Sequence, residues 1–368
     1  MRIGINCRSF LNQRSAGIGR YAQHLVKSLS DVDVVNDYFL YVRRNLFDLR
    51  KKIPRVPARN FQTKVDWFKQ GITKTLPEID IYHAPSPETL DIDGCKIIVT
   101  MHDLIYKAFP QGHTEATIAT TNQQFQGIVE RADKIICCSE YTKKDLLKYF
   151  PMDQNKIAMI HQGVDKNVFY PVSSDERPAA RAAIRAKGVT GPFILFVGTI
   201  EPRKNLKNLL KAFALIKKEF QGSLAVVGMK GWMSDDIGAL VEELNLKNNV
   251  HLLGYLTDEE LRYFYNEAEV FVFPSFYEGF GFPIVEAFSC GAPVVTSNAS
   301  SCPEVAAEAA LLIDPTNVQD MVDKILRVMR DRTLRNSLKE KGLKRATDFS
   351  FEKTARETLA VYRNVYEN

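Results

Sequence analysis

Residues 270–288 read VFVFPSFYEGFGFPIVEAF. The β-branched and aromatic residues at the start of this stretch are typical of a buried strand, and the glycines and prolines that follow indicate a loop. Pro283 suits the first position of a helix, which puts Phe282 at the cap position. Because Phe282 has no side-chain acceptor, a bound anion could satisfy the first N–H groups of that helix. We therefore predict a strand, a ligand-binding loop and a helix in direct succession.

Two carboxylates accompany this loop. Glu278 lies in the loop and Glu286 in the first turns of the helix, so both can face one pocket at different depths. Carboxylates held in this way are acceptors for sugar hydroxyls. The alternative is that Glu286 only complements the helix dipole and that Glu278 is solvated.

The same alternation of apolar runs and helical patterns extends over the whole chain, which indicates βαβ units around parallel sheets. The fold class is therefore α/β, with two doubly wound domains. A polar, proline-containing linker near 166–180 separates a domain at 1–170 from one at 180–350, and a helix at 351–368 packs back on the first. We expect six strands in each half, at 2–6, 38–42, 81–83, 96–101, 134–138 and 156–160, then at 193–197, 223–227, 250–252, 270–273, 293–297 and 310–312.

The composition limits the class of protein. A chain of 368 residues with 45% hydrophobic and 25% charged residues is neither disordered nor collagen-like, and it is long enough for two domains. It has no run of about 18 apolar residues, from which we expect no transmembrane helix and no signal peptide. Its six cysteines show no CxxC spacing, so we expect buried thiols in a reducing cytoplasm and no metal site.

A second candidate site lies in residues 193–205, which read FILFVGTIEPRKN. Arg203 and Lys204 stand in front of a helix N-terminus, where the macrodipole disfavours cations. An anion between them would resolve this conflict, and a guanidinium with an ammonium suits a diphosphate. The alternative is a solvated loop.

A third candidate is His102, delivered with Asp103 by the strand at 96–101 to its carboxyl end, where ligands of such sheets bind. The alternative is a structural histidine. The chain has no Ser/His/Asp elbow, no phosphate-binding Walker loop and no GxGxxG, so phosphorylation and nicotinamide chemistry lack their usual marks.

These segments resemble retaining glycosyltransferase family 4. Glu278 and Glu286, with seven residues between them, look like the E-x7-E signature of that family. The resemblance extends over nearly the whole chain, to GTIEPRKN at 198–205, HQGVD at 161–165, PEV at 303–305 and AGIGRY at 16–21.

The resemblance implies the GT-B fold, with two Rossmann-like domains facing across a cleft. It implies a retaining hexosyltransferase without a cofactor or an obligatory metal. The second domain would hold a nucleoside diphosphate sugar and the first a glycan or lipid-linked glycan. The Glu-Pro-Arg-Lys-Asn pattern is similar to that of polysaccharide mannosyltransferases and favours GDP-mannose over UDP-glucose. A nucleotide-sugar epimerase of the same fold and a non-catalytic sugar-nucleotide or membrane-binding protein are the alternatives.

The resemblance also implies roles for individual residues. Arg203 and Lys204 would bind the diphosphate, Glu278 the donor sugar and Glu286 the ribose. His102 would lie beside the reacting sugar. The remaining implied contacts are the loop N–H of Gly17, a base-binding turn and a backbone segment around the sugar and phosphate, formed by Gly17, Tyr255, Leu256, Phe280, Gly281, Phe282, Pro283 and Ile284.

Two departures from the family pattern affect these roles. Thr199 stands where many members have arginine, so Arg203 would serve instead. Ala16 replaces the first glycine of a common pair, which changes the phosphate loop.

Basic residues are concentrated in residues 43–74, the basic patch, which carries ten basic and two acidic residues while the rest of the chain is slightly acidic. We expect a loop and helix region there. Its place in the acceptor domain favours the anionic inner face of the membrane, or a lipid-linked diphosphate, over nucleic acid. We thus expect a cytoplasmic protein with peripheral membrane attachment. The alternative is a solvated surface.

Overall fold

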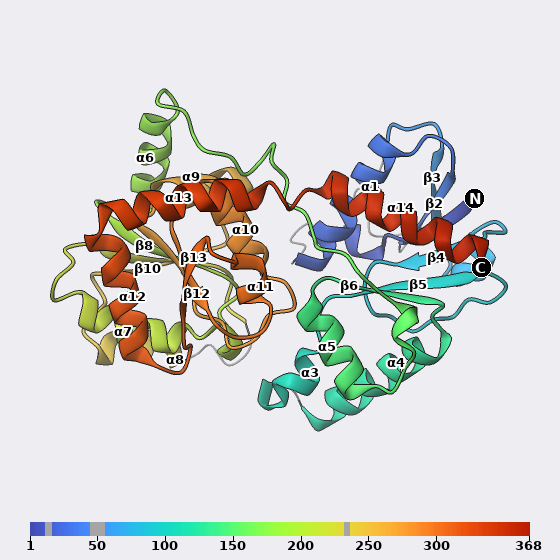
Figure 1. Cartoon of the computed structure of the whole chain (residues 1–368), viewed down its shortest axis with the longest axis horizontal. Coiled ribbons are helices and arrows are strands. Elements are labelled where there is room, and N and C mark those ends of the chain that lie inside the picture. Colours follow the sequence, from blue (N-terminus) through green and yellow to red (C-terminus); the bar gives the residue numbers. More distant parts are fainter. Residues whose placement is uncertain (12–16, 45–55, 113, 232–235) are drawn as a thin grey trace. The chain divides into compact units, whose positions relative to one another are not determined.

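Strands and helices alternate along the chain in the computed structural model, which describes residues 1–11, 17–44, 56–112, 114–231 and 236–368 (Figure 1). The chain forms two compact units. Unit 1 comprises residues 1–163 and 350–368, and unit 2 comprises residues 164–349. The division falls a few residues before the linker expected at 166–180, and the helix α6 (Arg177–Ala186) occupies the end of that segment.

Unit 1 is built on a parallel sheet of seven strands in the order β3-β2-β1-β4-β5-β6-β7. The expectation of six strands was wrong because it missed β3, which lies inside the basic patch and pairs in parallel with β2. The strands are β1 (Arg2–Asn6), β2 (Asp37–Arg43), β3 (Phe61–Asp66), β4 (Ile81–Ala84), β5 (Lys96–Met101), β6 (Lys134–Cys137) and β7 (Ile157–Met159).

The helices of unit 1 cover the sheet and include the last helix of the chain. They are α1 (Gly17–Val32), α2 (Ile72–Thr75), α3 (Ile105–Ala108), α4 (Glu115–Arg131), α5 (Glu140–Tyr149) and α14 (Phe351–Glu367), with short 3-10 turns η1 (Arg8–Leu11), η2 (Pro110–Gly112) and η3 (Gln154–Lys156).

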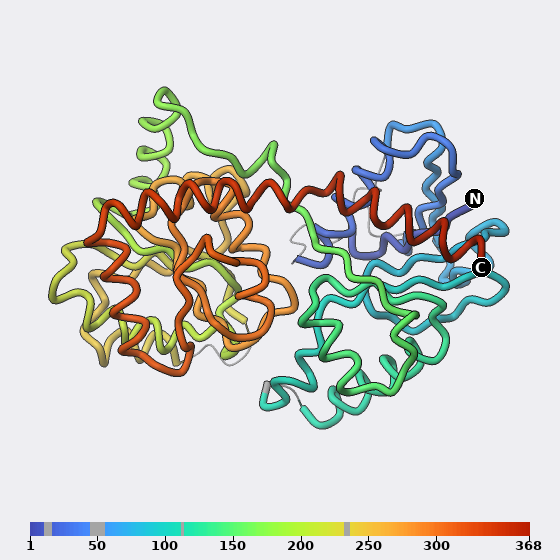
Figure 2. The backbone as a smooth tube through the Cα atoms, viewed as in Figure 1, coloured from blue at the N-terminus to red at the C-terminus, as the bar shows by residue number. Residues whose placement is uncertain are grey.

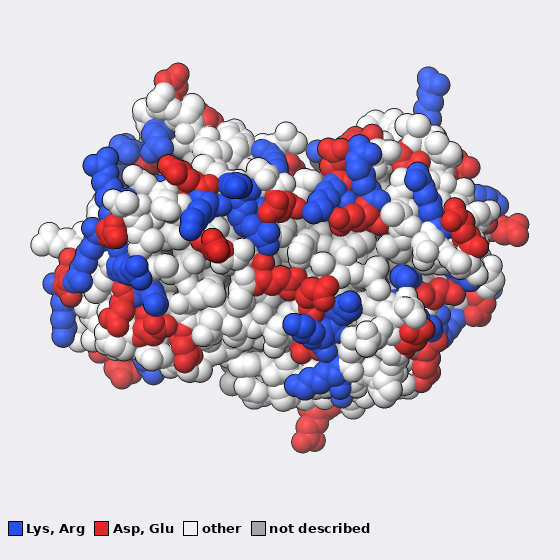
Figure 3. Space-filling view, in the orientation of Figure 1, with Lys and Arg blue, Asp and Glu red and all other residues white. Residues whose placement is uncertain are grey.

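Helix α14 packs along α1 (Figure 1). Ser350 caps it by accepting a hydrogen bond from Lys353 N, and Phe351, Leu359 and Tyr362 form its buried face. Its outer face carries charges of both signs, which lie interspersed in the space-filling view (Figure 3). The apolar residues that recur at helical spacing in the sequence are therefore those that α14 buries.

A chain of buried polar groups connects α14 to the sheet of unit 1. The Tyr362 hydroxyl lies 2.6 Å from His83 Nδ1, and His83 Nε2 lies 2.9 Å from Thr100 Oγ1. Thr100 Oγ1 continues to the Tyr21 hydroxyl of α1 at 3.3 Å. His83 is fully buried, and this burial lowers its pKa to about 3.

Lowering the pH from 7 to 5 is expected to destabilise unit 1 by about 2 kcal/mol through His83. The folded-state pKa of about 3 lies below the ordinary value of 6.5. Between these two values the unfolded chain binds a proton that the folded chain does not, so this stability is complete above pH 6.5 and falls as the pH decreases. Denaturant titrations at both pH values measure the effect. A His83→Gln variant should lose about 2 kcal/mol of the pH dependence, and an unchanged dependence would contradict this assignment.

Unit 2 is built on a parallel sheet of six strands, as expected, in the order β10-β9-β8-β11-β12-β13. The strands are β8 (Phe193–Val197), β9 (Ser223–Val227), β10 (Val250–Gly254), β11 (Val270–Phe273), β12 (Val294–Ser297) and β13 (Ala310–Ile313). Besides α6, its helical elements are η4 (Pro202–Lys204), α7 (Leu206–Ile216), α8 (Asp236–Glu243), α9 (Asp258–Glu267), α10 (Phe282–Ser289), α11 (Cys302–Ala306), α12 (Val318–Arg330) and α13 (Arg332–Ala346).

The chain crosses between the units twice, at 163–164 and at 349–350 (Figure 2). The two crossings touch, because a Cβ built on Gly163 would lie 2.1 Å from Phe351 N. Only glycine permits this approach. His161 O accepts a hydrogen bond of 2.8 Å from Thr354 Oγ1 at the same place.

Two further findings concern expectations from the sequence. No helix in the described ranges combines the length and the apolar character that crossing a bilayer requires. All six cysteines are described, each is a free thiol, and five of them are buried.

Candidate active site

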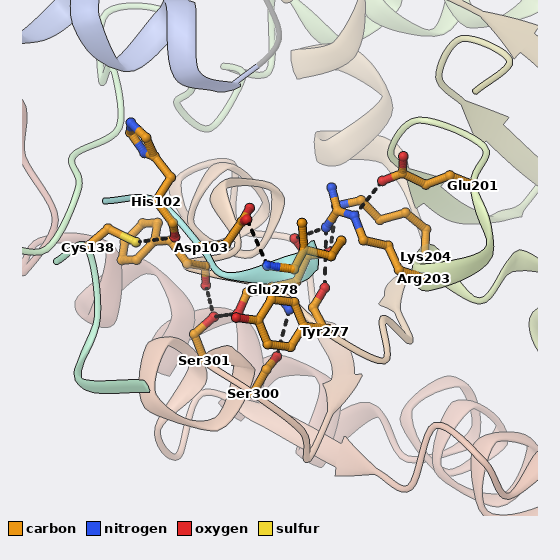
Figure 4. Close-up of polar contacts among 12 residues, drawn as sticks. His102, Asp103, Cys138, Glu201, Arg203, Lys204, Tyr277, Glu278, Ser300 and Ser301 are labelled. Carbon is orange, nitrogen blue, oxygen red and sulfur yellow. Dashed lines mark hydrogen bonds and ion pairs between the residues drawn. The ribbon is translucent and has the colours of Figure 1, made fainter. Parts of the chain in front are cut away.

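The central feature of unit 2 is a buried ion-pair cluster formed by Glu278, Arg203 and Lys204 (Figure 4). Glu278 Oε2 accepts a hydrogen bond of 2.8 Å from Arg203 Nη1, and Glu278 Oε1 accepts one of 2.6 Å from Lys204 Nζ. Glu201 adds a second carboxylate, 2.5 Å from Arg203 Nε. The two cations in front of α7 are therefore balanced by the protein's own carboxylates.

The sheet topology brings these residues together. Strands β8 and β11 are neighbours, so the loops after their carboxyl ends meet at one edge of the sheet. Asn205, in the left-handed region with φ 61°, joins the loops by donating to Pro274 O at 3.0 Å. Phe276 N donates to Arg203 O at 2.8 Å. Residues about 70 positions apart thus form one rigid structure.

Ser300 and Ser301 hold the loop that carries Glu278 (Figure 4). Ser300 Oγ accepts from Glu278 N at 2.9 Å. Ser301 Oγ donates to Glu278 O at 3.0 Å and lies 2.8 Å from Phe280 O. Sequence reasoning missed both serines. The only signal for them was their position just after β12, at the edge where the other loops gather.

Burial and charge act against each other in this cluster. Glu278 and Lys204 are only 6% and 7% exposed. Burial opposes ionisation of Glu278, yet Arg203 and Lys204 hold the pKa of its carboxyl below the ordinary value. Burial also lowers the pKa of Lys204, and Glu278 counteracts this. The cluster is stable as a set of charges only while all its members are present.

Helix α10 begins one residue earlier than expected. Phe282 is its first residue, Pro283 its second, and Gly281 occupies the cap position with φ 106°. The expectation of Phe282 as the cap was wrong, because glycine adopts this left-handed conformation without a steric penalty. No side chain caps the helix. Ile284 N donates to Gly281 O at 3.0 Å and Pro283 has no N–H, so Phe282 carries the N–H at this helix start that could face an anion.

Glu286 lies apart from the cluster in its hydrogen bonding. It is 4% exposed, and its Oε2 accepts a hydrogen bond of 3.0 Å from the Tyr265 hydroxyl of α9. The two carboxylates of the E-x7-E pattern thus have different partners.

In the turn after β10, Tyr255 is 55% exposed and Leu256 is buried.

In unit 1, His102 follows β5 and is almost completely enclosed. It is 9% exposed, its Nε2 lies 2.7 Å from Pro85 O, and its Nδ1 lies 2.7 Å from Gln162 Nε2. Its carbonyl accepts from Cys138 Sγ at 2.9 Å (Figure 4). Burial lowers the pKa of His102, so the imidazole is neutral at neutral pH.

Gly17 is the first residue of α1 and is exposed. One turn later, the Tyr21 ring lies edge-on to the His102 ring, with 5.0 Å between the centroids. Helix α1 therefore starts close to His102. Among the described residues, no three His, Cys, Asp or Glu side chains are grouped so that they could hold a metal ion.

Two Rossmann-like units, each built on a parallel sheet, are the architecture of the GT-B fold. Solved structures with this fold superpose on the whole chain. Sucrose-phosphate synthase from Thermosynechococcus elongatus has a TM-score of 0.78 at 22% identity, covering 100% of this chain and 99% of that one. WaaG, a glycosyltransferase involved in lipopolysaccharide biosynthesis, has a TM-score of 0.72 at 16% identity, covering 98% and 99%.

The chain belongs to glycosyltransferase family 4. Residues 15–168 match the model described as Glycosyltransferase Family 4, and residues 180–345 match that described as glycosyl transferases group 1. The O-antigen chain mannosyltransferase B of Escherichia coli is 32% identical, over 94% of this chain and 96% of that protein. The serotype-specific mannosyltransferase WbdA of Escherichia coli is 31% identical over 61% of this chain and 28% of its own length.

Proposed function

We propose that this glycosyltransferase transfers mannose from GDP-mannose to a glycan or lipid-linked glycan with retention of configuration. The observation that carries the proposal is that Arg203 and Lys204 both bond Glu278, in the loop that leads into the uncapped start of α10. The choice of mannose is supported by the mannosyltransferases among the relatives.

The donor diphosphate would lie against unit 2. Arg203 and Lys204 supply positive charge where negative charge develops on the leaving group, and the backbone N–H groups of Gly281 and Phe282 would donate to it. Within the backbone segment from Phe280 to Ile284, Pro283 has no N–H and Ile284 N already donates to Gly281 O at 3.0 Å. Glu278, fixed by both cations, would accept a hydrogen bond from a hydroxyl of the donor sugar. Glu286 would bind the ribose.

The bonding of His102 argues against its acting as a base. Pro85 O can only accept, so Nε2 carries the proton, and Nδ1 is occupied by the Gln162 amide. In the proposed reaction the bond from the anomeric carbon to the phosphate oxygen breaks and a bond to the acceptor oxygen forms on the same face. The acceptor proton passes to the departing phosphate oxygen. His102 would orient the sugar.

The donor can be tested by thermal-shift measurements with GDP and UDP sugars, followed by NMR of the product. The proposal expects stabilisation by GDP-mannose above the other sugars, and an α-linked mannosyl product from the α-configured donor. Stabilisation by UDP-glucose alone would overturn the choice of donor. A β-linked product would overturn retention.

We also propose that the basic patch contacts an anionic membrane surface. Six of its ten basic residues are described, Arg43, Arg44, Arg59, Lys64, Lys69 and Lys74. The other four, Arg50, Lys51, Lys52 and Arg55, lie outside the described residues. The support comes from the turn after β3. Asp66 accepts from the Tyr41 hydroxyl at 2.8 Å and from Gln70 N at 2.9 Å. The turn so built leaves Phe68 69% exposed next to the exposed Lys69.

Replacing both Lys64 and Lys69 by Gln should weaken binding to anionic vesicles about 30-fold, because each lysine near such a surface contributes about 1 kcal/mol. Phe68→Ser should weaken it further. Co-sedimentation with anionic and neutral vesicles at low and high salt measures this. Val35→Ser is the matched control, since Val35 is 84% exposed but lies outside the patch. Binding that is equal for both vesicle types, or absent, would leave the patch as a solvated surface.

A further inference from the structure

We propose that Gln162 is a positioning residue that fixes the His102 imidazole in one orientation and as the Nε2–H tautomer. The consequence for transfer rests on the role proposed for His102, whereas the tautomer itself does not. Gln162 directly precedes Gly163, the last residue of unit 1 before the chain enters unit 2.

The hydrogen bonds around the ring determine where its proton lies. The carbonyl of Pro85 has no proton, so the contact of 2.7 Å with Nε2 requires a proton on Nε2. In a neutral ring Nδ1 is then an acceptor, and it faces the Nε2 amide group of Gln162 at 2.7 Å. The Gln162 amide supplies the one donor that this tautomer needs.

Among the described residues, no carboxylate is hydrogen-bonded to either ring nitrogen of His102. Tyr21 of α1 meets the ring edge-on, and the fully buried His83 of β4 is neutral at neutral pH. Asp103 follows in the chain and is the acidic group that favours protonation of His102, against the larger effect of burial. A protonated ring would turn its Nδ1–H toward an amide N–H. The neutral form is therefore the one that this pocket fits.

Gln162 approaches the ring from a backbone that cannot shift easily. It is 1% exposed. On its N-terminal side, His161 O is bonded to Thr354 of α14, and on its C-terminal side Gly163 lies against the backbone of Phe351. The carbonyl of His102 is itself held by Cys138 and Thr142. Both the ring and the amide are thus fixed to the framework of unit 1.

Two substitutions separate a positioning role from mere packing. Gln162→Met keeps the volume but removes the donor, so the ring loses its fixed orientation. We expect kcat to fall on the order of tenfold, with little change in the KM for the donor. Gln162→Glu places a carboxylate opposite Nδ1, which favours an imidazolium with Nδ1–H and Nε2–H both bonded. The pKa of His102 should rise, so transfer at neutral pH should be lower than in Gln162→Met. As the pH increases and the ring loses its proton, transfer should rise to about the Gln162→Met level and not to that of the wild type, because neither variant supplies the donor.

The direct measurement is NMR of the ¹⁵N-labelled imidazole in the full-length chain. The expected result is the neutral Nε2–H tautomer in the wild type at pH 7 and a doubly protonated ring in Gln162→Glu. An Nδ1–H tautomer or a charged ring in the wild type would overturn the proposal. Gln126→Met, an exposed glutamine of α4 that bonds Glu130, is the matched control and should change neither spectrum nor rate.

A double-substitution cycle tests the coupling to transfer. In a His102→Ala background, Gln162→Met and Gln162→Glu should have no further effect on kcat, because the ring they act on is gone. Full additivity would overturn the positioning role. If His102→Ala alone transfers at the wild-type rate, the role proposed for His102 fails, and the NMR result still decides the state of the ring.

Discussion

Glu278→Gln is expected to lower the free energy of unfolding of unit 2 by about 3–5 kcal/mol, because it leaves the buried Lys204 and the nearby Arg203 without their shared carboxylate. Lys204→Met should cost a similar amount by leaving Glu278 with one partner. Both variants should also lose transfer. Denaturant titration followed by a signal from unit 2 measures the loss.

The double variant Glu278→Gln with Lys204→Met should lose much less stability than the two single variants together, since the charge left unpaired in each single variant is then absent. Lys324→Met is the matched control. Its ammonium lies 4.0 Å from Asp320 in a more exposed pair and should contribute less than about 1 kcal/mol. Strict additivity in the cycle would show that the two side chains do not depend on one another.

Arg203→Ala is expected to weaken the binding of a nucleoside diphosphate by about 10- to 100-fold, which corresponds to the 1.5–3 kcal/mol of a charged hydrogen bond. The guanidinium side chain is 19% exposed, so it can reach a ligand while Glu201 and Glu278 hold it. Isothermal titration calorimetry with GDP measures the change directly.

The control for Arg203 removes a positive charge elsewhere in unit 2. Arg330→Ala takes away a guanidinium that is 60% exposed and pairs with Glu219, and it should leave GDP affinity within about twofold because exposed charges are screened over about 10 Å. Unchanged affinity in Arg203→Ala would remove Arg203 from the diphosphate site.

The strands of unit 2 could be predicted because each is a short, mainly apolar run, and four of them, β8, β9, β11 and β12, are buried along their whole length. Strand β3 could not, because Gln62, Thr63 and Lys64 give it the composition of a polar surface segment. It forms at an edge of the sheet, with β2 as its only neighbouring strand among those described. There, pairing with one neighbour supplies the hydrogen bonds and polar side chains remain in contact with solvent.

The residues of the candidate site could be named from the sequence, but their mutual bonds could not. Nothing in the local pattern around Glu278 indicates that Arg203 and Lys204 bind it, since the contact arises from the neighbouring positions of β8 and β11. The sequence predicts a negative charge between Arg203 and Lys204. In the structure the Glu278 carboxylate supplies such a charge from within the chain. In the sequence, Gln162 stands out only as a member of the HQGVD motif at 161–165. Its contact with His102 could not be predicted because the two residues are 60 positions apart.

The place of α14 in unit 1 has a consequence for the order in which the protein folds on the ribosome. The His83 hydrogen-bond chain ends on Tyr362, and α14 covers α1, so unit 1 lacks an essential part until residues 350–368 have been translated. Unit 2, residues 164–349, is complete earlier. N-terminal domains usually fold first during synthesis. Here unit 1 can complete its native packing only after unit 2 has been synthesised. The surface of α1 that α14 covers in the folded protein is therefore left uncovered for as long as it takes to synthesise the whole of unit 2.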